Sequence, residues 1–152
     1  MRIKVLSKRE AKELLGKINE QFGSSFATEK VLFLSGDDIY LANRETIEGI
    51  RDNWRVNELG LYLGELKGNH VRLSIEGSQY VGQTATQNVL DIDESERARW
   101  LAGDTIEIDH PDTTYVIIKC GSDFFGCGKV KGRKLLNFVP KTRRISGRQL
   151  PE

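Results

Sequence analysis

Residues 125–144 bring together glycines, a cysteine and a run of cations, which are residue types that could hold a phosphate. They read FGCGKVKGRKLLNFVPKTRR, with three glycines within seven residues. A P-loop requires the spacing G-x-x-x-x-G-K-[ST], because its lysine reaches the phosphates and its hydroxyl binds Mg²⁺. Here Gly128-Lys129 is followed by Val130, and the flanking pattern predicts strand–turn–strand where the motif needs strand–loop–helix. The spacing therefore excludes a P-loop, and a dinucleotide-binding fingerprint fails for the same reason.

The two cysteines of the chain, Cys120 and Cys127, offer little chemistry of their own. Zinc requires four ligands, and these thiols have no neighbouring histidine or second cysteine pair to complete the set. A cysteine nucleophile needs an activating base and a lowered pKa, and His110 is the only candidate base nearby in sequence. We interpret both cysteines as buried structural thiols, and we expect neither a metal nor another cofactor.

The carboxylates of the chain have structural explanations. Those between Asp91 and Glu96 are typical of a helix start, where they cap amides and complement the helix dipole. Asp37 and Asp38 are typical of a hairpin turn. The sequence places no two carboxylates in environments that would shift their pKa values in opposite directions, as general acid–base catalysis needs. We therefore expect that the chain is not an enzyme.

The cations of the opening segment belong to a strong charge asymmetry along the chain. Residues 129–152 carry a net charge of +7 and residues 1–128 carry −6, although the whole chain is only +1. A segregated positive surface attracts polyanions. A plainer interpretation stays open, in which the lysines are solvated and protect a strand edge from aggregation. The candidate binding residues are Lys129, Lys131, Arg133, Lys134, Lys141, Arg143 and Arg144.

The alternation of a β-strand separates the glycines of this segment from its cations. Gly126 and Gly128 fall on one face, where glycine is typical of a bulge or of close approach by a backbone or a ligand. Lys129 and Lys131 fall on the opposite face, and Gly132 makes the turn into a return strand. The return strand contributes core residues at Leu135, Leu136, Phe138 and Val139.

The N-terminal part of the chain predicts one helix followed by strands. Ser7 and Glu10 form a capping box, and apolar residues then recur at helical spacing until Gly23, which predicts a helix over residues 8–22. Trp54, Tyr62 and Tyr80 could stack on nucleic-acid bases, but we expect core positions for them. The other predicted elements are a hairpin of strands 31–34 and 39–42, a short helix capped by Asn43, strands 59–66 and 71–75, and a short helical piece near residue 80.

After the polar stretch 83–87, which we interpret as a junction, the pattern changes to one short helix and several strands. The helix starts at the acidic residues 93–96 and stops at Gly103. Strands are predicted at residues 105–108, 114–119, 124–131 and 134–139, which together favour a small, mostly antiparallel barrel. The predicted fold is therefore α+β, with an N-terminal α/β lobe at residues 1–86 and a C-terminal barrel lobe at residues 87–152.

The overall composition is that of a soluble globular protein. The chain has 152 residues, of which 30% are charged and 38% hydrophobic, and this balance is ordinary for a folded domain. Neither an apolar run of membrane-spanning length nor a secretory signal is present. Two cysteines make no disulfide framework, so we expect a cytoplasmic location.

A resemblance to a known family rests on the residues discussed above. The stretches LDIDESERARWLAGDTIEID and TTYVIIKCGSDFFGCGKVKGRKLLNFVPKTRR resemble a PUA domain, a small RNA-binding pseudo-barrel. The ending is similar to the C-terminal region of Sun-family RNA cytosine-5 methyltransferases, where G-[FWY]-G-K-V precedes L-K-N-x-Y-P-K-x-x-R. The upstream stretch LGLYLGELKGNHVRLSIEGSQYV resembles the region before that domain. The order of the lobes is similar to the stand-alone pre-PUA/PUA factor of large-ribosomal-subunit assembly.

The resemblance implies a small mixed-sheet pseudo-barrel that binds RNA, often ribosomal or transfer RNA. The chain departs from the Sun-family enzymes because it lacks their methyltransferase domain and their catalytic cysteines. Cys127 also stands where the family has an aromatic residue, which argues against base stacking there.

Together, these observations predict a non-catalytic protein that binds structured ribosomal or transfer RNA through its C-terminal lobe, in ribosome assembly or RNA modification. Its seven candidate cations would dock the RNA backbone. Two alternatives remain. One is an adaptor whose N-terminal lobe, interpreted as acidic, recruits a separate RNA-modifying enzyme or assembly factor. The other is an enzyme of unknown type that uses the cleft between the lobes.

Overall fold

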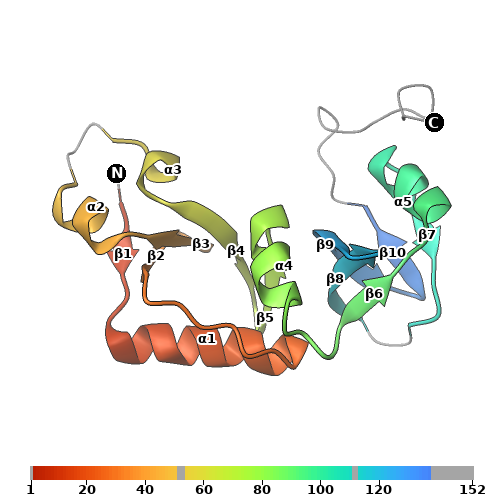
Figure 1. Ribbon diagram of the computed structural model, residues 1–152, viewed down its shortest axis with the longest axis horizontal. Helices are drawn as coiled ribbons and strands as arrows, with labels where there is room; N and C mark the ends of the chain where they lie inside the picture. The colour runs from red at the N-terminus through yellow and green to blue at the C-terminus, as the bar shows by residue number, and fades with distance from the viewer. Residues whose placement is uncertain (1, 51–53, 111–112, 138–152) are drawn as a thin grey trace.

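The computed structural model describes residues 2–50, 54–110 and 113–137, and within these ranges it contains two five-stranded sheets (Figure 1). The first sheet is antiparallel and follows chain order: β1 (Lys4–Val5), β2 (Val31–Ser35), β3 (Asp38–Ala42), β4 (Leu61–Lys67) and β5 (His70–Leu73). The second sheet has the order β6-β8-β9-β10-β7, with β6 (Val89–Asp91), β7 (Ile106–Glu107), β8 (Thr114–Cys120), β9 (Asp123–Lys131) and β10 (Lys134–Leu136).

Helix α1 (Lys8–Phe22) forms as its sequence predicts. The Ser7 hydroxyl accepts from the Glu10 amide at 3.1 Å, and the Glu10 carboxylate accepts from the Ser7 amide at 3.1 Å. Gly23 ends the helix in the left-handed conformation, with φ 56°. Because every third or fourth residue is apolar, the helix buries Leu14, Ile18 and Phe22 against the first sheet.

The other described helices are short, and most begin at a residue that can cap them. They are α2 (Arg44–Glu48), α3 (Val56–Leu59), α4 (Ile75–Gly82) and α5 (Glu94–Leu101). Asp93 caps α5 with a complete capping box, and the Ser74 hydroxyl accepts from the Gly77 amide at 2.9 Å to start α4. Asn43 precedes α2 as predicted, but its side chain makes no capping hydrogen bond. Among these helices and α1, none is long and apolar enough to cross a lipid bilayer.

The predicted α+β class is confirmed, with several differences in detail. The second sheet is mixed, because β6 pairs parallel with β8 while its other strands pair antiparallel. The sequence analysis missed β1, β6 and α3, which have two to four residues each and are too short for a periodic pattern. The strand predicted to reach Ile75 ends at Leu73 because Ser74 caps α4 instead. Phe138 and Val139 lie outside the described residues.

One apolar core joins the two sheets. It contains Leu63 and Val71 of the first sheet together with Tyr115, Ile117 and Cys127 of the second. The polar stretch predicted as a junction lies against the end of α1, where the amides of Thr86 and Gln87 donate to the Phe22 carbonyl. A second core lies between α5 and the other face of the second sheet, and a third lies beneath α2 and α3. The lobes are therefore packed together, with α4 between the sheets (Figure 1).

Candidate nucleic-acid interface

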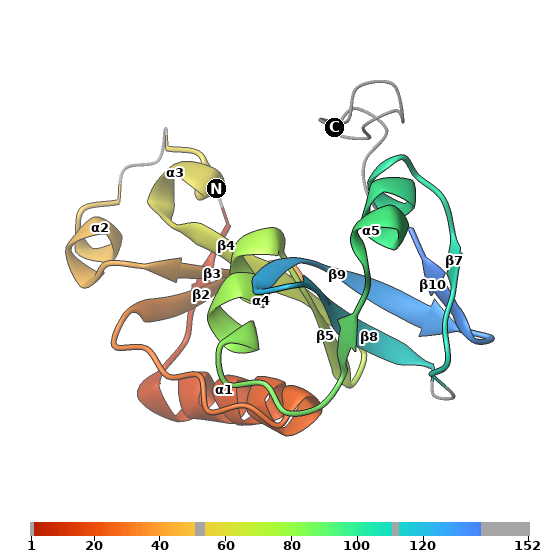
Figure 2. The same ribbon diagram turned by 45° about the vertical axis from the view of Figure 1, so that its right-hand side comes forward.

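The hairpin of β9 and β10 places three of the predicted cations on one face. Gly132 and Arg133 both have φ 59°, which is the pattern of a type I′ turn and matches the twist of the paired strands. Lys131 and Lys134 lie directly opposite each other in the ladder, and so do Lys129 and Leu136. Since opposite residues share a face and the side-chain period is two, Lys129, Lys131 and Lys134 share one face. The hairpin lies at the end of the second sheet away from α4 (Figure 2).

The glycines of β9 lie on the other face, as the alternation predicts, but they face the core of the protein. A Cβ on Gly128 would come within 2.7 Å of Leu135 Cδ1, and one on Gly126 would lie 3.4 Å from the Trp100 ring. A register shift between Ile118 and Lys119 marks a bulge beside Gly126. The close approach made at these glycines is therefore by core side chains, and not by a ligand.

Lys129 lies where the two lobes meet. Its ammonium is 5.6 Å from the ring centroid of Tyr115, its partner across the ladder, and Tyr115 belongs to the core shared by both lobes. Lys67 lies at the end of β4. Glu65, which is 2.7 Å from the Lys67 ammonium, raises the pKa of Lys67, and Tyr115 adds a smaller effect. Lys67 is therefore ion-paired within the N-terminal lobe, whereas Lys129 lies over a ring of the core that both lobes share.

The sequence analysis missed Lys67, and no local signal could have found it. Sixty-two positions separate Lys67 from Lys129, so no local pattern relates the two.

Acidic residues of β7 and the loop after it flank the opposite side of the hairpin. The Arg133 guanidinium lies 2.7 Å from the Asp109 carboxylate, and Lys134 lies opposite Glu107 in the β10–β7 ladder. Exposed ion pairs of this kind contribute little stability, but they offset local charge. Positive charge is therefore concentrated on the β9 side of the hairpin, at Lys129 and Lys131. Lys141, Arg143 and Arg144 lie outside the described residues.

The N-terminal lobe, which we interpreted as acidic, does not carry the acidic charge of the chain. Residues 1–86 contain 12 basic and 12 acidic residues, so the N-terminal lobe is balanced. Residues 87–128 contain 3 basic and 9 acidic residues, and they carry the acidity. Counting charge by lobe would have revealed this from the sequence. The asymmetry lies within the C-terminal lobe, between an acidic first half and a basic second half.

Both cysteines are buried, as expected for structural thiols. Cys127 lies opposite Ile117 and faces the core shared by the lobes, whereas Cys120 faces the core under α5. Burial raises the pKa of Cys127 to about 12, so its thiol is neutral at physiological pH. In the described ranges, no three His, Cys, Asp or Glu side chains come close enough to hold a metal ion.

The three aromatic residues considered for stacking have different environments. Trp54 and Tyr62 are half-buried, with Trp54 packed on the small core beneath α2 and α3. Tyr80 is 49% exposed on α4 and stacks on Phe26 at a centroid distance of 6.1 Å. The expectation of a core position was therefore wrong for Tyr80.

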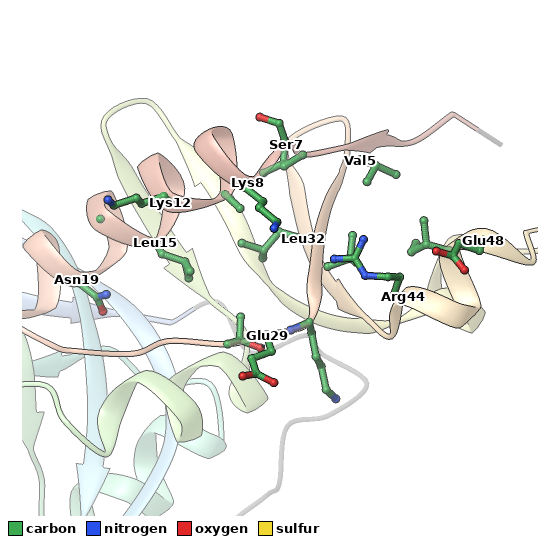
Figure 3. Close-up of a pocket in the computed structure, with 17 residues that line it drawn as sticks. Val5, Ser7, Lys8, Lys12, Leu15, Asn19, Glu29, Leu32, Arg44 and Glu48 are labelled. Carbon is green, nitrogen blue, oxygen red and sulfur yellow. Dashed lines mark hydrogen bonds between the residues drawn. The ribbon is translucent and has the colours of Figure 1, made fainter.

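A groove of about 740 Å³ lies in the N-terminal lobe, beside the first half of α1 (Figure 3). Leu15 of α1 and Leu32 of β2 are among its apolar lining, while Lys8 and Lys12 of α1 and Arg44 of α2 add cations. It is separate from the β9–β10 hairpin, which lies in the other lobe (Figure 1). Its chemistry is that of an apolar floor with a mainly basic margin, where four cations outnumber Glu29 and Glu48.

Comparison with known proteins gives one match, over the C-terminal lobe. Residues 87–145 match the family model of the PUA domain of the methyltransferase RsmF. No curated protein matches the chain. The matched segment contains α5 and the strands of the second sheet, including the whole β9–β10 hairpin.

Proposed function

We propose that this chain is a non-catalytic RNA-binding protein, because residues 87–145 match the PUA domain of an RNA methyltransferase family and such domains bind RNA. Its ligand is structured ribosomal or transfer RNA, and its role is in ribosome assembly or RNA modification in the cytoplasm. No resident cofactor takes part.

The observation that carries the proposal is the shared face of Lys129, Lys131 and Lys134 next to the lobe junction. Double-stranded RNA is recognised mainly through its shape and through contacts to phosphates and 2′-hydroxyls. Three ammonium groups on neighbouring strands can meet successive phosphates. Lys141, Arg143 and Arg144 continue the same chain segment beyond β10 and would add further phosphate contacts.

The non-catalytic part of the proposal is supported by the state of the thiols. A cysteine nucleophile acts as the thiolate, whereas the Cys127 thiol is buried, with a pKa raised to about 12. Cys120 is likewise buried in a separate core. We therefore assign the C-terminal lobe a role in binding RNA and not in modifying it.

The salt dependence of binding tests the proposal. Neutralising about six phosphates gives a slope of log K against log salt on the order of −4 to −5. A Lys129→Glu, Lys131→Glu, Lys134→Glu variant is expected to bind a ribosomal RNA hairpin at least tenfold more weakly, with a shallower slope. Fluorescence anisotropy across a salt series measures both quantities.

A matched control changes the same charge elsewhere. Lys8, Lys12 and Lys30 are exposed and border the groove in the N-terminal lobe, so their reversal to Glu is expected to change RNA affinity by less than about threefold. Equal losses in the two variants would contradict the proposed face, because net charge alone would then explain binding. An affinity that barely changes with salt would contradict the mechanism.

The adaptor role remains the second candidate, and the groove in Figure 3 is the feature that favours it. An apolar floor with basic margins suits an acidic, amphipathic segment of a protein partner better than it suits RNA. Pull-down after nuclease treatment separates the two roles. An adaptor retains a protein that the Lys8, Lys12 and Lys30 variant loses, whereas an RNA-binding protein retains its partners only while RNA is intact.

A further inference from the structure

A shallow pocket of about 430 Å³ lies between α4, α5 and the β8–β9 turn, away from the cationic hairpin. The geometry points to a subsite for one unpaired RNA base in this pocket, an inference that rests on the proposed RNA binding and extends it from the backbone to a base. Seven residues line it: Gln79, Gln83, Arg97, Ser122, Asp123, Phe124 and Phe125. They come from three separate elements that only the fold brings together.

Arg97 and Phe125 form the stacking platform. The guanidinium carbon of Arg97 lies 5.2 Å from the Phe125 ring centroid, and Phe125 meets Trp100 edge to face at 5.8 Å. Trp100 is 4% exposed, so the ring beneath the guanidinium is held by the core under α5. The Arg97 side chain remains 37% exposed. A planar guanidinium that rests on a ring and keeps contact with solvent is a surface on which unpaired bases stack.

The second wall of the pocket is fixed by a glycine. Phe124 packs against Gly82 of α4 so closely that a Cβ there would lie 2.5 Å from the ring. The Lys119 ammonium also lies 5.5 Å from the centroid of Phe124. Phe124 therefore joins α4 to the start of β9 and sets the width of the pocket.

Side-chain amides supply the groups that can read the edge of a base. Gln79 of α4 and Gln83, the residue that caps the end of this helix, are exposed, and the side-chain amide of Gln83 donates to the backbone carbonyl of Gln79 at 3.2 Å. Each glutamine side chain carries both donors and an acceptor, as base edges do. Ser122 adds a hydroxyl from the facing turn.

The charge of the pocket favours a base over a phosphate. Asp123 Oδ2 lies 3.9 Å from the Arg97 guanidinium, so the lining carries one positive and one negative charge. A phosphate in the pocket would face the Asp123 carboxylate, whereas the amino group of a base could donate to it. This balance contrasts with the hairpin face, where three lysines gather.

The two sites lie at opposite ends of β9. From Phe125 of the pocket, Lys129 is four and Lys131 six residues further along β9, which is about 13 and 20 Å at the usual rise of a strand. An RNA that docks its backbone on the hairpin and places an unpaired base in the pocket must extend over these distances. The ligand class is therefore a structured RNA with an unpaired nucleotide next to its helix.

The test measures the affinity of the full-length protein for two RNAs. One is a hairpin with a single-stranded 3′ extension, and the other is the same RNA with abasic positions in that extension. Base stacking on protein side chains predicts that wild type prefers the base-containing RNA by about fivefold or more. Arg97→Lys keeps the charge but removes the planar guanidinium. We expect this variant to bind base-containing and abasic RNA with nearly equal affinity. Gln79→Ala with Gln83→Ala is expected to reduce the differences among the four bases.

The control and the salt series separate failure of the subsite from failure of RNA binding. Arg99→Lys on α5, near Asp104, is expected to leave the preference unchanged. Equal binding of base-containing and abasic RNA, with a steep salt slope retained, would overturn the subsite and leave the proposed function standing. Loss of all RNA binding by wild type would overturn both. An equal effect of Arg97→Lys and Arg99→Lys would also overturn the subsite.

Discussion

At the scale of single residues, Gly128 shows how the core limits which side chain a position of the β9–β10 hairpin can hold. Its backbone lies against Leu135 and Ile118, both fully buried, so a Cβ would lie 2.7 and 3.1 Å from their terminal methyl carbons. Gly126 lies on the same strand and face, but its nearest neighbour would be 3.4 Å away in the Trp100 ring. The two glycines look equivalent in sequence and differ in the room that the core leaves them.

We therefore expect Gly128→Ala to destabilise the protein by about 1–3 kcal/mol, because an added methyl group overpacks the core. Gly126→Ala, the matched control, is expected to change the unfolding free energy by less than about 0.5 kcal/mol, since its contact is of ordinary van der Waals length. Urea denaturation followed by circular dichroism measures both. Equal effects of the two substitutions would contradict this account of the core.

At the scale of elements, α4 connects the two sheets through glycines. A Cβ on Gly77 would lie 2.1 Å from the Leu63 carbonyl oxygen of β4, and one on Gly82 would meet the Phe124 ring of β9. The helix thereby approaches the backbone of β4 and a ring of β9 more closely than a larger residue would allow. Gln79 of α4 and its C-terminal cap Gln83 also line the proposed base subsite.

Gly77→Ala is expected to destabilise the protein by more than 2 kcal/mol, because the clash is with backbone that cannot rotate away. The control is Gly16→Ala in α1, where nothing lies within 4 Å of the added Cβ. There the substitution is expected to stabilise the protein by about 0.5–1 kcal/mol, as alanine loses less conformational entropy than glycine in a helix. Thermal unfolding of both variants measures these changes in stability, which are expected to have opposite signs. A Gly77→Ala variant that is more stable than wild type would contradict the close packing of α4 on β4.

At the scale of the whole molecule, the lobes share one core, so neither sheet buries its apolar face alone. Ile117, fully buried in the second sheet, packs in the same cluster as Val71 and Leu73 of the first. Lys129 of the candidate cationic face also lies over Tyr115, which belongs to this shared core. Stability and the proposed RNA surface therefore both depend on the lobes staying together.

We expect the two lobes to unfold in one transition. The chain has two tryptophans, Trp54 in the N-terminal lobe and Trp100 in the C-terminal lobe, so Trp54→Phe and Trp100→Phe variants each report on one lobe by fluorescence. Ile117→Ala, introduced into each variant, is expected to cost about 2–5 kcal/mol and to lower both denaturation midpoints together. Midpoints that move separately would mean that the lobes are independent domains.

The sequence by itself determined the features that depend on neighbouring residues. Ser7 with Glu10, Asp93 with Glu96, and Gly132 at the hairpin turn act within four residues, so their types and spacing were enough to place α1, α5 and the β9–β10 turn. The motif around Gly126 and Lys129 likewise indicated a resemblance to a PUA domain, because its residues are close together in the chain, and the family model of that domain matches residues 87–145.

Only the tertiary structure decided what these elements face. Packing turned Gly128 towards Leu135, placed Asp109 beside Arg133 and laid Arg97 over Phe125. Most of these contacts join residues that are more than twenty positions apart, and even the nearer ones depend on how α5, β9 and β10 pack around a common core. Propensity and periodicity describe one element at a time, whereas the position of a charge or a ring in a site depends on the shared core that holds several elements together.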